Sequence, residues 1–201
     1  MRSDSLRSSA PYHHYVIGKQ GKKNRSMSKD NKYDGLSWLS EEGKYHLMYL
    51  DTLVENDNMR EVFSLKENSD FSTTLHQILV KKYDKDHKSL NELQLNLFLC
   101  MHLENSGQSC SILSCLQEWF PEHLDKFVNA LNEINANKCA DIIKKAINIL
   151  PNDGSWFFDS SDEKSEELMS KLDSEFSDYP DGNMNDLYRK YAETHRAKLI
   201  S

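Results

Sequence analysis

Apolar residues recur every three or four positions along most of the chain, which is the spacing of one face of an α-helix. The pattern becomes regular at Ser37, where WLSEEGKYHLMYLDTLVEN predicts a helix with Ser40 as its N-cap. The same spacing returns in DFSTTLHQILVKKYDK. On the first of these helices, we expect the inward-facing residues to be Leu39, Tyr45, Met48, Tyr49, Leu53 and Val54.

The most apolar of the expected helices is SLNELQLNLFLCMHLEN. Ser89 followed by Glu92 is the pattern of a capping box, so we expect the helix to begin there. Its apolar residues cover much of the circumference, which is typical of a helix at the centre of a core. The polar run ENSGQS is expected to end it, with Gly107 in a left-handed turn.

Further helical patterns follow in PEHLDKFVNALNEINA, NANKCADIIKKAINILP and NMNDLYRKYAETHRAKLI. The two-residue alternation of a half-buried strand is not sustained anywhere in the sequence. The chain has seven glycines and four prolines in 201 residues, which also favours helices joined by short turns. The sequence therefore predicts an all-α fold, a single domain of about seven or eight packed helices over residues 35–201.

The first part of the chain differs from the rest in charge and in pattern. Residues 1–26 contain six Lys or Arg and one Asp, and they have no periodic apolar positions. Such a segment cannot bury enough apolar surface to offset the entropy cost of ordering. We expect residues 1–34 to form a disordered basic tail, and the residues before Met27 are candidates for a non-native extension.

Charge and hydropathy narrow the class of protein. The formal net charge is −7, which argues against direct nucleic-acid binding and indicates that a charged partner would be basic. No apolar run approaches the roughly 20 residues of a membrane span, and the start lacks the apolar region of a secretory signal. We expect a cytoplasmic protein with no membrane contact. The four cysteines lie among apolar residues at helical spacing, and we expect buried free thiols at Cys100, Cys110, Cys115 and Cys139.

The stretch DSSDEKSEELMSKLDSEFSDYPDG, residues 159–182, combines helical periodicity with an excess of acid. Residues 153–186 contain eleven acidic residues and two lysines, a formal net charge of −9. On a helical wheel, five apolar residues of the stretch fall within one arc of about 100°, the width of a core-facing stripe. We expect these five to pack inward: Leu168, Met169, Leu172, Phe176 and Tyr179.

The carboxylates outside that arc have two explanations. A polar face rich in Glu and Asp is common on helices, and a solvated face needs no partner. A rigid column of negative charge can also meet a basic groove on another protein, with charge steering the encounter. The candidate partner-binding surface consists of Asp162, Glu163, Glu166, Glu167, Asp173 and Asp178.

The sequence offers little for catalysis or metal binding. It contains no HExxH, GxSxG, P-loop or GxGxxG motif. His102 and Glu104 form H-x-E, but the P-C-x-x-C that completes a zinc deaminase site is missing, so we expect His102 to be an ordinary helix histidine. A calcium loop with Gly182 at its sixth position would have Tyr188 where the bidentate Glu belongs. We predict no catalytic residue, no metal ligand and no cofactor.

Three segments read in order resemble the C-terminal helical domain of the bacterial DNA-mimic protein family: LNELQLNLFLCMHLENSG, FPEHLDKFVNALNEINANKCADIIKKAINILP and LDSEFSDYPDGNMNDLYRKYAETH. The resemblance covers about residues 36–196. It departs from the family pattern at Ser106 and Gln108. The motif positions are Glu104, Asn105, Ser106 and Gly107, then Leu172, Asp173, Phe176, Tyr179 and Asp181.

The resemblance implies an all-α fold without known catalytic activity or cofactor. For members that act as mimics, it implies that acidic side chains imitate a phosphate backbone and occupy the site of a DNA-binding protein. We therefore expect a non-enzymatic interaction module whose partner is a basic protein such as a DNA-binding transcription regulator, and the sequence leaves room for a homodimer. Two alternatives stay open: an immunity or antitoxin-type protein that neutralises a toxin, and a hydrolase that uses carboxylates facing each other across a cleft.

Overall fold

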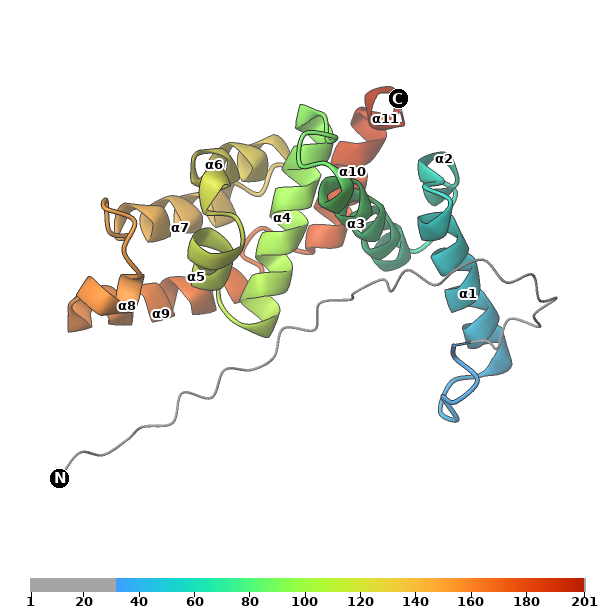
Figure 1. Ribbon diagram of the computed structural model, residues 1–201, viewed down its shortest axis with the longest axis horizontal. Coiled ribbons are helices and arrows are strands. Elements are labelled where there is room, and N and C mark those ends of the chain that lie inside the picture. Colours follow the sequence, from blue (N-terminus) through green and yellow to red (C-terminus); the bar gives the residue numbers. More distant parts are fainter. Residues whose placement is uncertain (1–31, 201) are drawn as a thin grey trace. The chain divides into compact units, whose positions relative to one another are not determined.

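The computed structural model describes residues 32–200, and every regular element in that range is a helix (Figure 1). All of these helices belong to one compact unit that begins at Trp38. The longer ones are α1 (Glu41–Glu55), α3 (Asn68–Lys85), α4 (Glu92–Ser109), α6 (Leu124–Glu133), α7 (Asn137–Asn148), α9 (Glu163–Ser177) and α10 (Met184–Thr194). The short ones are α2 (Met59–Val62), α5 (Ile112–Ser114), the π-helix η1 (Cys115–Trp119), the 3-10 helix η2 (Pro121–His123), α8 (Phe157–Ser160) and α11 (Arg196–Leu199).

The prediction of an all-α fold is confirmed, and the seven longer helices correspond to the expected packed array. The predicted disordered tail falls almost wholly on residues 1–31, which lie outside the described residues, while residues 32–34 form a turn. The boundary placed at residue 35 stays a prediction. Within residues 32–200, no helix is both long and apolar enough to cross a membrane.

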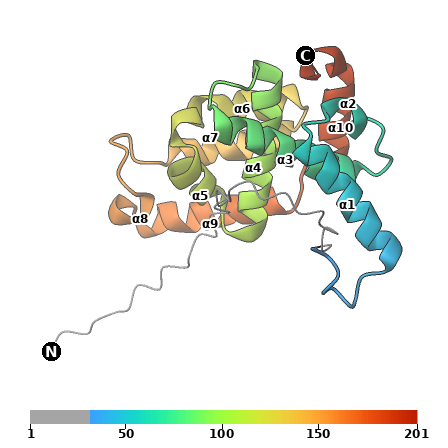
Figure 2. The same cartoon turned by 45° about the vertical axis from the view of Figure 1, so that its right-hand side comes forward.

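Helix α4 lies between two groups of helices (Figures 1 and 2). On one side it packs against α3, which also contacts α1 and α10. On the other side it packs against α6 and α9, and α7 contacts both of these. Because α4 is apolar around most of its circumference, it can bury side chains against both groups, as the sequence predicts.

Helix α4 begins at a capping box, but two residues later than predicted. The Asn91 side chain accepts a hydrogen bond from the Gln94 backbone N at 3.0 Å, and the Gln94 side chain accepts one from the Asn91 backbone N at 3.2 Å. The predicted cap, Ser89, instead donates its hydroxyl to the carbonyl of Lys82 in α3 at 2.8 Å. Ser89 therefore closes the preceding turn.

The prediction that α4 ends before Gly107 in a left-handed turn is wrong, because α4 continues through Gly107 to Ser109. Gly107 instead allows α9 to pack closely against α4. A Cβ placed on Gly107 would lie 3.0 Å from Cδ1 of Phe176, which is tighter than most real contacts. The missing side chain lets α9 lie directly against α4.

Two acidic side chains near α9 cap helices far away in the sequence. Asp173 accepts a hydrogen bond from the backbone N of Ile112 at the start of α5, at 2.7 Å. Asp181, in the loop after α9, accepts from the backbone N atoms of Lys138 and Cys139 at 3.1 and 2.8 Å. The N-cap residue of α7 itself, Ala136, has no side-chain oxygen to offer. Asp181 therefore satisfies the free N–H groups at the start of α7 and places its charge at the favourable end of the helix dipole.

Some side chains predicted to face inward are exposed. Tyr45 and Tyr49 on α1 are 68% and 40% exposed, because α1 packs on the unit through a narrower face that includes Leu53. On α9, Leu168 is 39% exposed, whereas Met169, one position further, is buried. Tyr179 is also partly exposed, at 37%. Periodicity locates a face, but the width of the buried stripe depends on the neighbouring helix.

The cysteine prediction is correct for three of four side chains. Cys100, Cys115 and Cys139 are free and buried. Burial raises the pKa of Cys115 and Cys139 to about 12, so these thiols stay protonated at neutral pH. Cys110 is free but exposed, because it is the residue at which the chain leaves α4.

We predict that Asp181→Ala lowers the free energy of unfolding by about 1–2 kcal/mol, because two N–H groups at the start of α7 lose their acceptor. Urea denaturation measures this loss. Asp178→Ala removes a nearby exposed carboxylate at the C-cap of α9 and serves as the control, with an expected change within about 0.5 kcal/mol. Equal effects of the two substitutions would contradict the capping role of Asp181.

Gly107→Ala tests the close approach of α4 and α9. Alanine favours a helix over glycine by about 1 kcal/mol, but the added methyl group crowds the buried Phe176 ring at a cost of about 1–3 kcal/mol. We expect a net loss of about 1 kcal/mol in urea denaturation. In a Phe176→Leu background the same substitution should cost less, and an increase in stability in the native background would refute the packing argument.

Candidate functional site

The acidic stretch begins where α9 begins. Asp162 is the N-cap, and its Oδ1 accepts a hydrogen bond from the backbone N of Ser165 at 2.8 Å. Hydrogen bonds from Ser165 lower the pKa of the Asp162 carboxyl, which is therefore ionised at neutral pH. An acidic N-cap with acidic residues in the first turn explains why the helix starts here.

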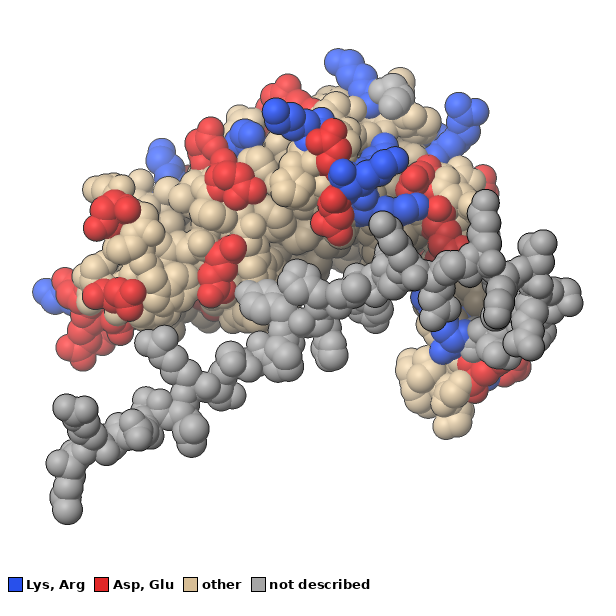
Figure 3. Space-filling view, in the orientation of Figure 1, with Lys and Arg blue, Asp and Glu red and all other residues tan. Residues whose placement is uncertain are grey.

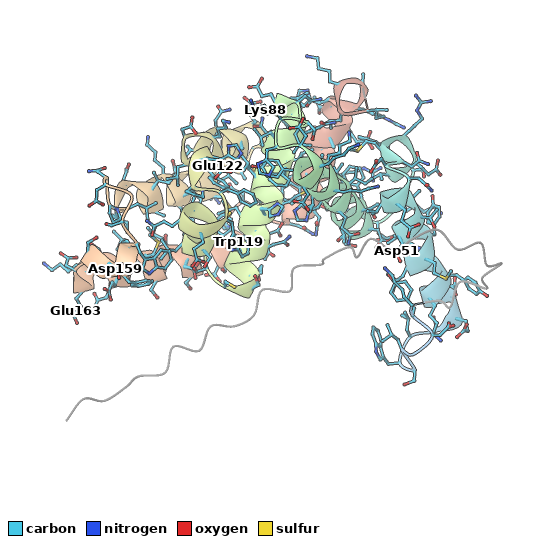
Figure 4. All side chains as sticks on the ribbon, viewed as in Figure 1. Asp51, Lys88, Trp119, Glu122, Asp159 and Glu163 are labelled. Carbon is cyan, nitrogen blue, oxygen red and sulfur yellow. The ribbon has the colours of Figure 1, made fainter. Side chains whose placement is uncertain are left out.

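Four of the six predicted partner-binding residues gather at this end of α9: Asp162, Glu163, Glu166 and Glu167 are all exposed. Ser161 donates its hydroxyl to Oε1 of Glu166 at 2.9 Å. Asp159 of α8 is also exposed, and Figure 4 shows it at the same end of the helical unit as Glu163. Acidic side chains cluster over this end in the space-filling view (Figure 3). We call Asp159, Asp162, Glu163, Glu166 and Glu167 the α9 acidic end.

The other two predicted residues lie elsewhere. Asp173 is turned towards α5, where it is half-buried and bonded to Ile112. Burial raises the pKa of the Asp173 carboxyl, and the hydrogen bond from Ile112 opposes that rise. Asp178 is exposed at the opposite end of α9. A helical wheel cannot reveal that a loop 61 residues away in sequence reaches Asp173. A partner-binding role for all six residues stays a prediction.

A second acidic group, Glu104 on α4, lies inside the helical unit. The Tyr188 hydroxyl of α10 lies 2.9 Å from Oε2 of Glu104 and 3.1 Å from the carbonyl oxygen of Cys100. Tyr179 lies near the same carboxylate. Burial raises the pKa of Glu104, although the hydroxyls of Tyr188 and Tyr179 act to lower it. Sequence reasoning assigned Glu104 to the family motif and to an incomplete H-x-E pattern, and it missed this network.

Tyr179 adopts an unusual backbone conformation. Three non-glycine residues in the described range have positive φ, namely Asp57 at 50°, Asn135 at 65° and Tyr179 at 53°, and each follows the C-cap of a helix. Asn and Asp tolerate this left-handed region, whereas a bulky aromatic residue there is uncommon. The fold holds Tyr179 in a strained position in which its hydroxyl reaches Glu104.

The histidines near Glu104 are neutral at physiological pH. His76 Nε2 lies 2.9 Å from His102 Nδ1. Burial lowers the pKa of His76 to about 3 and that of His102 to about 4. The His102 ring packs between Phe98 and Phe120, which is consistent with the expected structural role of this histidine. Over residues 32–200, His, Cys, Asp and Glu side chains nowhere form a group of three that could hold a metal ion.

The buried position of Glu104 predicts a pH-dependent contribution to stability. The pKa of Glu104 is higher in the folded state than its ordinary value of 4.5, so the protonated side chain stabilises the folded state. This stabilisation is complete below pH 4.5 and is lost as the pH rises through the pKa of Glu104 in the folded state. Glu104→Gln removes this titration. We expect the Tm of the variant, relative to that of the unmodified protein, to be higher at pH 7 than at pH 4. A difference in Tm that does not change with pH would contradict a raised pKa.

Comparison with known proteins places the chain in a family. A family model described as DMP19-like protein matches residues 88–195, more than half of the chain. The matched range contains Glu104, Asp173, Tyr179 and Asp181, the residues of the cross-helix hydrogen bonds. The curated proteins and the solved structures give no match. The chain belongs to the DMP19-like family, named after DNA mimic protein 19, and the predicted resemblance is confirmed over residues 88–195, while its extension to residue 36 stays a prediction.

Proposed function

We propose that this protein is a non-enzymatic DNA mimic whose α9 acidic end occupies the DNA-binding site of a basic protein. Membership of the DMP19-like family supports a DNA mimic in general. The observation that carries the proposal further is the gathering of five exposed carboxylates, Asp159, Asp162, Glu163, Glu166 and Glu167, within nine residues of chain. Phosphate-binding sites consist of Lys and Arg side chains and backbone N–H groups, and carboxylates can satisfy both.

Charge density limits what α9 can imitate. From Asp162 to Asp178 the helix is about 24 Å long at about 1.5 Å per residue. Seven acidic residues and two lysines in this range leave a formal net charge of −5, or one charge per about 5 Å. A single DNA strand carries one charge per about 3.4 Å and the duplex one per about 1.7 Å. Helix α9 therefore resembles one strand more closely than a duplex, and the matching surface on the partner is a groove that follows one phosphate backbone.

Local helix stability explains part of the acidic end without any partner. Asp162 is the N-cap, and Glu163 and Glu166 lie in the first turn, where the helix dipole favours negative charge. Glu167 lies beyond that turn, and Asp159 belongs to α8. These two residues add charge that the start of α9 does not require. The excess favours recognition of a basic partner over capping alone.

The proposal predicts a salt-sensitive partner that competes with DNA. We expect the immobilised full chain to retain a DNA-binding protein from a lysate of the source organism at about 50 mM salt and to release it at about 500 mM, because screening weakens contacts between exposed charges. Duplex DNA added at low salt should displace the same protein. The triple variant Glu163→Gln, Glu166→Gln, Glu167→Gln should retain at least tenfold less of it, measured by quantitative mass spectrometry.

The matched control removes three acidic charges at exposed positions elsewhere: Glu42→Gln, Asp125→Asn and Asp141→Asn. Both triple variants have the same net charge, so a difference in how much partner they retain reports the position of the removed charges and not the overall charge. Retention lost equally in both variants would disprove the α9 acidic end as the recognition surface. Retention of a toxin that DNA fails to displace would favour the immunity-type alternative.

A further inference from the structure

A polar cavity of about 250 Å³ lies between α3, α4 and α10 and shares no residue with the α9 acidic end. Met101 is the apolar residue in its lining. The other lining residues are Ser72, Thr73, His76, Gln77, Glu104, Asn105, Asn185 and Tyr188. Small-molecule sites are concave and usually mostly apolar with a few polar groups, so a lining as polar as this one suits a small, polar ligand.

In its ionised form, Glu104 brings a negative charge to this cavity without a positive partner among the described residues. No Lys or Arg belongs to the lining, and the described ion pairs do not include Glu104. The neighbouring His76 is neutral, since its pKa is lowered to about 3. An ionised carboxylate has about four lone-pair positions, and the Tyr188 hydroxyl uses one of them. The remaining capacity is available to a hydrogen-bond donor in the cavity.

A second polar group at the cavity also lacks a partner. Ser72 is buried, and its hydroxyl oxygen has almost no accessible surface and no hydrogen-bond partner among the described residues. Buried polar groups in native proteins are rarely left unsatisfied, so this oxygen is a polar group beneath the cavity wall whose hydrogen-bonding capacity is unused. Ser72 lies on α3, outside the family match, whereas Glu104 and Tyr188 lie within it.

The chemistry of the lining selects one class of ligand. An anion would be repelled by Glu104, and an apolar molecule would leave the amides and hydroxyls without partners. A divalent metal ion favours six or more oxygen ligands or a set of His and acidic ligands, and here His76 and Glu104 supply two such side chains. A primary ammonium group carries one positive charge and three N–H donors, which suits a carboxylate flanked by amide and hydroxyl oxygens.

We propose that the cavity between α3, α4 and α10 binds a small organic cation through its primary ammonium group, with Glu104 as the charged partner of that group. Asn185 offers an uncharged side-chain oxygen from α10. The ammonium can come from a free amine or from a lysine side chain of another polypeptide, and the chemistry at Glu104 is the same in both cases. The site is independent of the proposed DNA mimicry.

The test is isothermal titration calorimetry of the full chain with n-butylammonium chloride, and with 1-butanol and sodium butyrate as neutral and anionic probes of the same length. We expect saturable binding of butylammonium alone. Glu104→Gln keeps an oxygen acceptor for Tyr188 but removes the charge, and it should weaken binding about tenfold or more, the loss expected for a charge-assisted hydrogen bond. Asn185→Met fills the cavity from α10 while Glu104 is kept, and it should weaken binding by a similar factor.

Glu118→Gln, an exposed position outside the lining, is the control and should bind as the unmodified chain does. Circular dichroism establishes that each variant is folded, and Asn185→Met keeps the test decisive if Glu104→Gln unfolds. Butylammonium binding that is undetectable, is matched by butanol or survives both cavity variants would overturn the proposal. A capped Gly-Lys-Gly peptide separates the two sources: binding of the peptide assigns the site to protein lysines, and binding of butylammonium alone assigns it to free amines.

Discussion

The contact between the Phe176 ring and the bare backbone of Gly107 fixes where α9 lies, and several other interactions depend on it. Because Gly107 has no Cβ, α9 approaches α4 closely enough for the ring to lie on the helix backbone. That approach brings Asp173 within reach of the start of α5 and carries the following loop to α7, where Asp181 caps the helix. It also brings Tyr179 to Glu104. One missing methyl group thus permits three polar links between distant segments.

The acidic stretch therefore contains two kinds of carboxylate. Asp173 and Asp181 accept backbone N–H groups of other helices, and replacing them costs stability because those donors lose their partners. The residues of the α9 acidic end face solvent, and apart from Asp162, which caps α9, replacing such a charged side chain usually changes stability by less than about 0.5 kcal/mol. The other four can therefore vary to suit a partner without disturbing the fold. The capping carboxylates cannot, although each of them counts as much in the formal net charge as an exposed one.

Periodicity predicted the helices well because helix formation is local and the buried stripe repeats every three or four residues. Ser40 was correctly predicted as the N-cap of α1, since a cap is also a local feature. The failures involve partners that are distant in sequence. The helix propensity of glycine predicts a helix end at Gly107, but the position lacks a side chain because the ring of Phe176, 69 residues further on, packs against it. Glu104 reads as one polar residue among many, because the tyrosine that contacts it is 84 positions away.

The two acidic sites are electrically separate, which follows from the length of α9. Asp162 and Tyr179 lie 17 residues apart, about 25 Å along a helix and its cap. Tyr179 lies close to Glu104, and Glu104 lines the cavity. The cavity therefore lies near the C-terminal end of α9, opposite the α9 acidic end. At physiological salt the Debye length is about 8 Å, so charge at one end is largely screened from the other. A cation bound at Glu104 would therefore leave the field of the α9 acidic end nearly unchanged, and coupling between the sites would require movement of α9 against α4.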